Sequence, residues 1–279
     1  MLNLLAVTEI VRRALEEDLG VGDITSLALF TSADKGYGTI LAKQEGIIAG
    51  LPVAELTFKL CPPGCTFIPL VPEGTRVQAG QEVARVEGPL LAILGGERVA
   101  LNFLQRMSGI ATLTSLYVEK VKPYKARICD TRKTVPGLRL LDKYAVRIGG
   151  GINHRWNLGD AVLLKDNHIK AAGSILKAIR RVREVIPLTT KVEVEVETLE
   201  QVAEALEGGA DLILLDNMEV AEMREAVKLA QGYALVEASG GITLDRVAEV
   251  AATGVDFISV GALTHSVSAL DLSLELLQV

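Results

Sequence analysis

Several short apolar runs in the second half of the sequence end in residues that can hold anions or a metal ion. ARIC is followed by Asp130-Thr131-Arg132-Lys133, AVLL by Lys165, and LILL by Asp216. Arginine and lysine bind carboxylates and phosphates, and Mg²⁺ takes one or two carboxylates together with phosphate oxygens. One such ending is ordinary loop composition, but the series predicts one polar rim.

Basic residues are concentrated between Ala126 and Lys170, although the whole chain has a net charge of −6. A basic run is most often a solvated face. Here several bases lie in glycine-bearing loops after strands, and His154 stands beside Arg155. This arrangement predicts a pocket for a polyanion. Nucleic acid is the alternative anion, but the segment lacks the interleaved aromatic residues that stack bases.

Two glycine loops follow the last predicted strands, SGGI at 239–242 and VGAL at 260–263. Backbone N–H groups of such loops, near the start of a helix, often bind phosphate in α/β barrels. Because a helix is expected around Leu244, the first loop is the better phosphate candidate.

These residues require a frame of parallel strands. Apolar, β-rich runs recur after residue 126 as ARICD, AVRIG, AVLLK, KVEVEV, LILLD, ALVEA and FISVG. Helical patterns separate the later runs, and strands that alternate with helices form a parallel sheet. The pattern predicts an incomplete TIM-like α/β barrel, with its chemistry at the carboxyl ends of the strands. An open doubly wound sheet is the alternative, but IGGGINHR does not fit its glycine fingerprint.

The run KVEVEV is the most informative single strand. Its alternation places Lys191, Glu193 and Glu195 on one face and valines on the other. Valines suit the outer face that packs on helices, so the charged face is expected inside the barrel. Buried carboxylates need a partner or a ligand. We therefore expect Lys191 to pair internally and Glu195 to face the ligand.

The first part of the chain has a different pattern. Leu4–Asp18 and Pro52–Leu60 are predicted helices, and short β runs occupy most of Gly36–Gly88. Helical periodicity covers Leu90–Val121, with breaks expected at Gly95-Gly96 and Gly109. The prediction is an N-terminal α+β layer (sandwich) domain, residues 1–112, joined by the segment 268–279. The barrel domain would then cover residues 113–267.

Composition narrows the class of protein. The chain has 279 residues and 3 cysteines, too few for a disulfide framework. Cys61 and Cys65 lack a second pair to complete a zinc site. No apolar run reaches the ~20 residues of a membrane span, and the first residues do not form a signal peptide. We therefore expect a cytoplasmic protein that binds neither membrane nor nucleic acid.

The motifs of the whole chain resemble one family. The long run TRKTVPGLRLLDKYAVRIGGGINHRWNLGDAVLLKDNHI is similar to the signature of the quinolinate phosphoribosyltransferase family. Further similar segments occur in order, namely EDLGVGDIT, GERVALNFLQRMSGIAT, KVEVEVETLEQ, LLDNM, VEASGGI and DFISVGALTHS. The resemblance implies transfer of phosphoribose from 5-phosphoribosyl 1-diphosphate to quinolinate with loss of CO₂, a step in NAD biosynthesis. A related group linked to molybdenum transport is an alternative.

The resemblance also implies roles for individual residues. Arg98 would reach into the site of a second subunit, in a dimer or a higher oligomer such as a hexamer. Arg132, His154 and Arg155 would hold the quinolinate carboxylates. Lys133 and Lys165 would act on the substrate and the diphosphate, and Glu195 and Asp216 on the ribose hydroxyls and Mg²⁺. Ser239, Gly240 and Gly261 would receive the 5′-phosphate. No organic cofactor is implied.

Two other functions fit some of the same residues. Lys133 or Lys165 at a strand end could form the Schiff base of an aldolase, although the many arginines do not favour it. A binding protein for phosphorylated sugars would keep the glycine loops but has little need for Glu195 with Asp216. We expect catalysis by positioning and electrostatics, without a covalent enzyme intermediate, because no Cys–His or Ser–His pair stands at suggestive positions.

Overall fold

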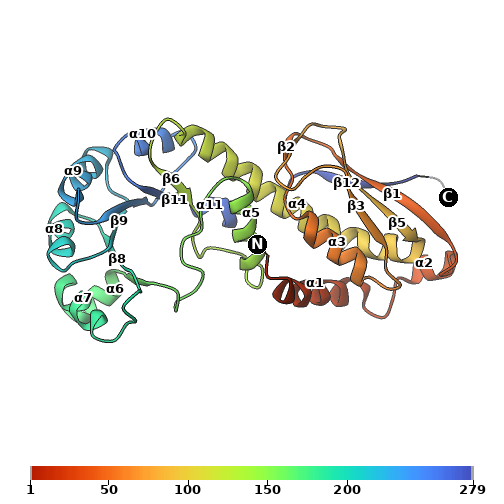
Figure 1. The fold of residues 1–279 in the computed structure, drawn as a ribbon, viewed down its shortest axis with the longest axis horizontal. Coiled ribbons are helices and arrows are strands. Elements are labelled where there is room, and N and C mark those ends of the chain that lie inside the picture. The colour runs from red at the N-terminus through yellow and green to blue at the C-terminus, as the bar shows by residue number, and fades with distance from the viewer. Residues whose placement is uncertain (1, 278–279) are drawn as a thin grey trace. The chain divides into compact units, whose positions relative to one another are not determined.

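The structure is a computed structural model that describes residues 2–277, and the chain forms two compact units (Figure 1). The first unit contains the residues up to Ser115, Thr134–Gly150 and the residues from Leu263 on. The second contains Leu116–Lys133 and Gly151–Ala262. Residues 134–150 thus cluster with the first unit, whereas the sequence placed them in a barrel domain spanning 113–267.

An antiparallel sheet of four strands organises the first unit, in the order β12-β1-β5-β3. The strands are β1 (Lys35–Ala42), β3 (Thr66–Pro69), β5 (Glu82–Pro89) and β12 (Leu272–Leu277), and the short pair β2 (Gly46–Ile47) and β4 (Arg76–Val77) lies apart. Strand β12 pairs with β1 from Tyr37↔Leu277 to Ala42↔Leu272. The last segment of the chain therefore completes the sheet that one of its first segments begins.

Five helices accompany this sheet: α1 (Leu4–Leu19), α2 (Ile24–Leu29), α3 (Leu51–Leu60), α4 (Leu90–Val121) and α5 (Arg139–Ile148). Helix α4 runs without interruption, so the breaks expected at its glycines are wrong. A Cβ atom at Gly109 would lie 2.2 Å from the carbonyl oxygen of Ser268, and one at Gly96 would meet the Phe58 ring at 3.0 Å. These glycines let other segments approach the helix closely.

Helix α5 replaces the strand that the run AVRIG was expected to form. Leu141, Ala145 and Val146 are buried, as are Asp142 and Lys143, so burial along this segment does not alternate as it would on a half-buried strand. Asp142 on the same helix accepts two hydrogen bonds from the Arg106 guanidinium, 2.9 and 2.8 Å long. This buried ion pair and the packing of Gly149 on Ala111 hold residues 134–150 in the first unit.

The second unit is built on a parallel sheet of six strands in the order β6-β11-β10-β9-β8-β7. The strands are β6 (Arg127–Cys129), β7 (Val162–Leu164), β8 (Val192–Val196), β9 (Leu212–Asp216), β10 (Leu235–Ser239) and β11 (Phe257–Ser259). Strands β7 to β11 lie side by side in sequence order, and β6, the first strand of the unit, lies beside β11, the last. With Ile152 bridging to Cys129 of β6, this curved sheet is the predicted incomplete α/β barrel.

Helices lie along the outer face of this curved sheet (Figure 1). They are α6 (Asp166–Ala172), α7 (Ile175–Arg183), α8 (Leu199–Glu207), α9 (Val220–Ala230) and α10 (Val247–Ala251). The short α11 (Ala262–His265) follows β11 and belongs to the first unit from Leu263 on. On β8, Val192, Val194 and Val196 are completely buried. Glu193 and Glu195, which alternate with them, therefore point to the inner side, as the sequence predicted.

Among residues 2–277, no helix combines the length and apolar composition needed to cross a lipid bilayer.

Candidate active site

A polar cavity of about 600 Å³ opens where the strands of the second unit end. Residues from the carboxyl halves of the six strands, or from the loops that follow them, share its wall, as expected for a parallel α/β sheet. Its lining consists of Thr131, Arg132, Lys133, His154, Arg155, Leu163, Lys165, Glu195, Leu214, Asp216, Asn217, Glu237, Ser239, Gly240, Gly241 and Ser259.

All of the predicted site residues line this cavity except two. Arg98 lies exposed on α4, among the residues of the first unit. Gly261 follows β11 and is partly buried, but it does not contribute to the cavity wall. Nine of the eleven residues named from the sequence therefore lie together around this cavity.

Cations dominate one side of the cavity, with Arg132, Lys133, Arg155 and Lys165 in its wall. Burial lowers the pKa of Arg155, and the nearby charge of Arg132 lowers it further, while Glu193 and Asp160 act in the opposite direction. These two guanidinium groups carry like charges and repel each other in a partly buried site. An anion bound between them would offset this repulsion. The geometry therefore suits a carboxylate or phosphate ligand.

Lys165 and Glu195 form an ion pair inside the cavity. Lys165 caps the start of α6, since its backbone N–H donates to Nδ1 of His168 over 3.0 Å. This contact gives His168 a local structural role. Side-chain exposure is 45% for Lys165 and 16% for Glu195, so the ammonium group faces the cavity while remaining neutralised. The ammonium group of Lys165 is therefore accessible to an anionic ligand, and it has a partner when no ligand is bound.

Lys191 was expected to pair inside the barrel, but it pairs elsewhere. It lies before the first residue of β8, and its Nζ atom is 3.0 Å from Asp211 on the surface. The lysine of the internal Lys–Glu pair is Lys165, which comes from a different strand end. The alternation of KVEVEV predicted the side of the sheet correctly, but it did not indicate that the strand begins after Lys191.

The loop after β10 and the residue after β9 are fitted closely to each other. Asn217 has a left-handed backbone (φ 54°), its N–H donates to the carbonyl of Ser239 over 3.0 Å, and its side chain donates to Asp216. A Cβ atom on Gly240, whose φ is 88°, would lie 2.2 Å from the Asn217 side chain. Only glycine fits this position. Helix α10 begins at Val247, later than the expected Leu244.

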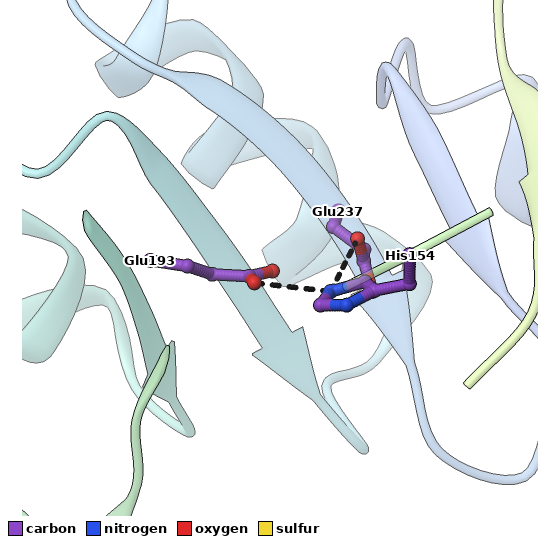
Figure 2. Close-up of side chains that lie close together, drawn as sticks. All are labelled: His154, Glu193 and Glu237. Atoms are coloured by element: carbon purple, nitrogen blue, oxygen red, sulfur yellow. Dashed lines mark ion pairs between the residues drawn. The ribbon is translucent and has the colours of Figure 1, made fainter. Parts of the chain in front are cut away.

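The segment before His154 is anchored by a buried carboxylate. Asp130, completely buried after β6, accepts a hydrogen bond of 3.0 Å from the backbone N–H of His154 and one of 2.6 Å from the Asn153 side chain. His154 then points its ring towards the inside of the sheet, where Glu193 of β8 and Glu237 of β10 meet it (Figure 2). The predicted proximity of His154 and Arg155 to the strand ends thus has a specific structural basis.

Glu237 is a site residue that the sequence analysis did not identify. It is almost completely buried, and burial together with the charge of Glu193 raises its pKa to about 7, although His154 acts in the opposite direction. A single glutamate within the apolar run LVEAS was the available signal. A buried carboxylate in an apolar strand needs a partner inside the fold, and here the partner comes from a loop that sequence periodicity does not place.

Two carboxylates, Glu195 and Asp216, stand where a Mg²⁺ ion carried by a phosphorylated substrate could be held. Both belong to strand ends in the wall of the same cavity. Lys165 occupies one oxygen of Glu195, and Asn217 donates to one oxygen of Asp216, which leaves one oxygen on each group for other contacts. Mg²⁺ commonly takes one or two carboxylates and completes its shell with phosphate oxygens and water, so these residues fit the ion.

Comparison with known proteins gives matches over almost the whole chain. The N-terminal domain of the quinolinate phosphoribosyl transferase family matches residues 23–108, and its C-terminal domain matches residues 110–275. The chain is 44% identical over 274 residues to a protein of Bacillus subtilis named probable nicotinate-nucleotide pyrophosphorylase [carboxylating], covering 98% of this chain and 94% of that protein. It is 45% identical to the nicotinate-nucleotide pyrophosphorylase [carboxylating] of Mycobacterium leprae, over 97% of each chain.

Solved structures agree with this assignment. The crystal structure of NadC from Streptococcus pyogenes superposes with a TM-score of 0.95 at 41% identity, over 100% of this chain and 99% of that one. Both domains, their order and the fold are therefore shared with these relatives. The chain belongs to the quinolinate phosphoribosyltransferase family.

Proposed function

We propose that this protein transfers the phosphoribosyl group of 5-phosphoribosyl 1-diphosphate to the ring nitrogen of quinolinate. The products are nicotinate mononucleotide, CO₂ and diphosphate. The observation that carries the proposal is the pair of arginines, Arg132 and Arg155, in the wall of a cavity that is also lined by two lysines and three carboxylates. Family membership and the names of the relatives support the same reaction.

Both substrates are strongly anionic, and this explains the cations. Quinolinate carries two carboxylates, which suit the planar forks of Arg132 and Arg155. The diphosphate of the donor suits Lys133 and Lys165, because an ammonium group binds phosphate as a point charge. Fixed cations in a partly dry site also offset the repulsion between the two anionic substrates. The loop of Ser239 and Gly240 is the candidate site for the 5′-phosphate.

Breaking the bond between C1 of the ribose and the diphosphate oxygen leaves positive charge on the ribose. Glu195 and Asp216 lie where carboxylates can stabilise that charge or hold the ribose hydroxyls, as carboxylates do in glycoside transfer. The departing diphosphate takes the bonding electrons, and the quinolinate nitrogen donates its lone pair to C1. Lys165, already beside Glu195, is placed to neutralise the leaving group.

Glu195 and Asp216 are the residues that would hold a Mg²⁺ ion bound to the diphosphate. When bound, the ion neutralises phosphate charge and thereby improves the leaving group. Lys165, Glu195 and Asp216 lie at the ends of β7, β8 and β9 and would orient the diphosphate, and Lys133 lies in the loop after β6.

Decarboxylation requires no organic cofactor in this scheme. Once the ring nitrogen has bonded to C1, the ring is cationic. The carbon–carbon bond to the adjacent carboxylate then breaks, CO₂ leaves, and the electron pair remains on the ring carbon next to the cationic nitrogen until a proton is added. Arg132 and Arg155 contribute by holding the substrate so that nitrogen faces C1.

The direct test is release of ¹⁴CO₂ from quinolinate labelled in the carboxylate next to the ring nitrogen. Reactions with the sugar donor and Mg²⁺ should release label in proportion to nicotinate mononucleotide formed. Parallel reactions with nicotinate, or without the sugar donor, should release none. Nucleotide formation from nicotinate alone would replace the proposed acceptor, and the absence of any product would overturn the proposed activity.

We also propose that the working enzyme is a homodimer in which each copy completes the other's site. Arg98 is exposed on α4 and makes no contribution to the described cavity of its own chain. In the proposed dimer, the partner subunit's Arg98 would add a further guanidinium to the quinolinate site. Mixing inactive Arg98→Ala and Lys165→Ala chains should restore about a quarter of wild-type activity by random pairing, because one dimer in two then holds one intact site. No restoration would contradict the shared site.

A further inference from the structure

His154 lines two cavities, and hydrogen bonds as well as packing hold its ring. It lines the site cavity and also a second cavity of about 410 Å³, which the first residues of β7, β9 and β11 help to enclose. The histidine side chain is 14% exposed.

Both ring nitrogens of His154 have partners within the described residues. Nε2 lies 3.0 Å from Oε2 of Glu193 and 3.6 Å from Oε2 of Glu237, two carboxyl groups that reach the ring from different strands (Figure 2). Nδ1 accepts a hydrogen bond of 2.8 Å from the backbone N–H of Arg155. Side chains therefore hold the ring at Nε2, and the main chain holds it at Nδ1.

These contacts select one form of the ring. A backbone N–H can only donate, so Nδ1 must carry a lone pair, and the proton of the imidazole then lies on Nε2. This proton points at the Glu193 carboxylate. A metal ion among His154, Glu193 and Glu237 is disfavoured. It would require the lone pair on Nε2 and the proton on Nδ1, where that proton would face the Arg155 N–H.

The same contacts fix Arg155. The bond to Nδ1 sets the direction of the Arg155 peptide, while the guanidinium Nη1 donates to the carbonyl of Ala161 over 3.0 Å. Asp130 holds the peptide just before it through the His154 N–H. The orientation of the imidazole thus helps to set the position of the Arg155 backbone, and with it the point from which the arginine side chain extends.

We propose that Glu193 and Glu237 are positioning residues that lock His154 in the Nε2–H form, and thereby hold Arg155 in place for the carboxylates of quinolinate. Glu193 accepts the Nε2 proton, and Glu237 limits rotation of the ring on its other side. The inference rests on the proposed function for the identity of the ligand. It extends that function to two buried glutamates that act through His154 and Arg155.

The first experiment determines the form of the ring in the full-length wild-type protein. The chain contains 3 histidines, so ¹⁵N-histidine labelling gives three ring systems, and a His154→Gln variant identifies the signals of His154. Long-range ¹H–¹⁵N spectra distinguish the two neutral forms and the charged form. The Nε2–H form is expected. The Nδ1–H form, a charged ring, or tightly bound metal found by elemental analysis would overturn the proposal.

The second experiment separates positioning from packing. Glu193→Gln keeps an acceptor for the Nε2 proton, whereas Glu193→Met keeps a similar volume without one; Glu237→Gln and Glu237→Met form the matching pair. Glu207→Gln is the control, because it makes the same charge change at an exposed position of α8. KM for quinolinate, KM for the sugar donor and kcat are measured for each.

We expect Glu193→Met to raise KM for quinolinate by about 10- to 100-fold, because a misplacement of about 1 Å in a site can cost up to about 100-fold, with a much smaller change in KM for the sugar donor. Glu193→Gln should recover most of the loss, and Glu237→Met should have the weaker effect. Equal values for the Gln and Met variants would overturn the positioning role. Absence of quinolinate turnover in the wild type would refute the proposed function, while the ring form measured by NMR would stand. If a Met variant does not fold, the wild-type spectrum alone decides the proposal.

Discussion

Each unit of the molecule buries a cluster of charged groups, and the two clusters are built in opposite ways. In the first unit, Asp142 is completely buried and receives both arms of the Arg106 guanidinium, and Arg106 also donates to the carbonyl of Thr264. In the second unit, Glu193 and Glu237 lie side by side, and Arg132 and Arg155 disfavour each other.

The difference separates a structural cluster from a functional one. A buried ion pair with matched partners is complete without any ligand. A cavity with like charges grouped together is incomplete, and an anionic ligand supplies what the fold lacks. The comparison therefore predicts that the two clusters will respond oppositely to mutation.

Removing Arg106 should have the largest effect on stability. Arg106→Ala leaves Asp142 buried without its cation, and stranding one member of a buried pair costs about 3–5 kcal/mol. Urea unfolding of the variant should show that decrease in the free energy of unfolding. A variant that unfolds like the wild type would show that the pair is not structural.

Removing Arg132 should affect activity instead. Arg132→Ala is expected to lower kcat/KM for quinolinate by about 100- to 1,000-fold, the range for loss of one charge-stabilising donor. Its free energy of unfolding should stay close to that of the wild type, because the mutation also removes repulsion from Arg155. CO₂ release and urea unfolding measured on the same preparation provide the two values, and wild-type turnover would remove Arg132 from the site.

Glu237 should give stability a dependence on pH. Its pKa is raised in the folded protein, so the folded state holds a proton that the unfolded state has lost between about pH 4.5 and 7. Stability from this group therefore falls as pH rises through that window. Glu237→Gln cannot lose a proton, and its free energy of unfolding should exceed that of the wild type by about 1–3 kcal/mol more at pH 8 than at pH 5. Parallel pH profiles would contradict the shift.

The exposed pair of Lys191 and Asp211 should have the smallest effect. The lysine side chain is 68% exposed, and exposed ion pairs contribute about 0–1 kcal/mol because water and salt screen them. Lys191→Ala should leave both the free energy of unfolding and kcat/KM nearly unchanged. A large loss of activity would restore the internal role that the sequence had suggested for this residue.

Sequence patterns predicted the barrel and most of the cavity because both depend on local order along the chain. Each apolar run such as LILLD ends at the same edge of a parallel sheet, so the residue after the run is placed without knowledge of its neighbours. The alternation of β8 fixed the side on which Glu193 and Glu195 lie.

The errors have a common physical origin in contacts between distant segments. AVRIG is short enough to suit either a strand or a helix, and the Arg106–Asp142 pair, 36 residues apart in sequence, accompanies the helix. The glycines of α4 were expected to break it, but they accommodate segments such as Ser268 from the end of the chain. Glu237 was missed because its partner His154 comes from a loop with no periodicity.

The pairing of β12 with β1 has a consequence for synthesis of the protein. Residues 116–133 and 151–262, which form the barrel, have all been made before Leu272–Leu277 leaves the ribosome. Until then, β1 presents a bare edge of unpaired peptide groups, which is a site for wrong pairing with other chains. All residues of the second unit are therefore synthesised before the first unit is complete. A chain that lacks β12 would leave the edge of β1 unpaired and would be prone to aggregation.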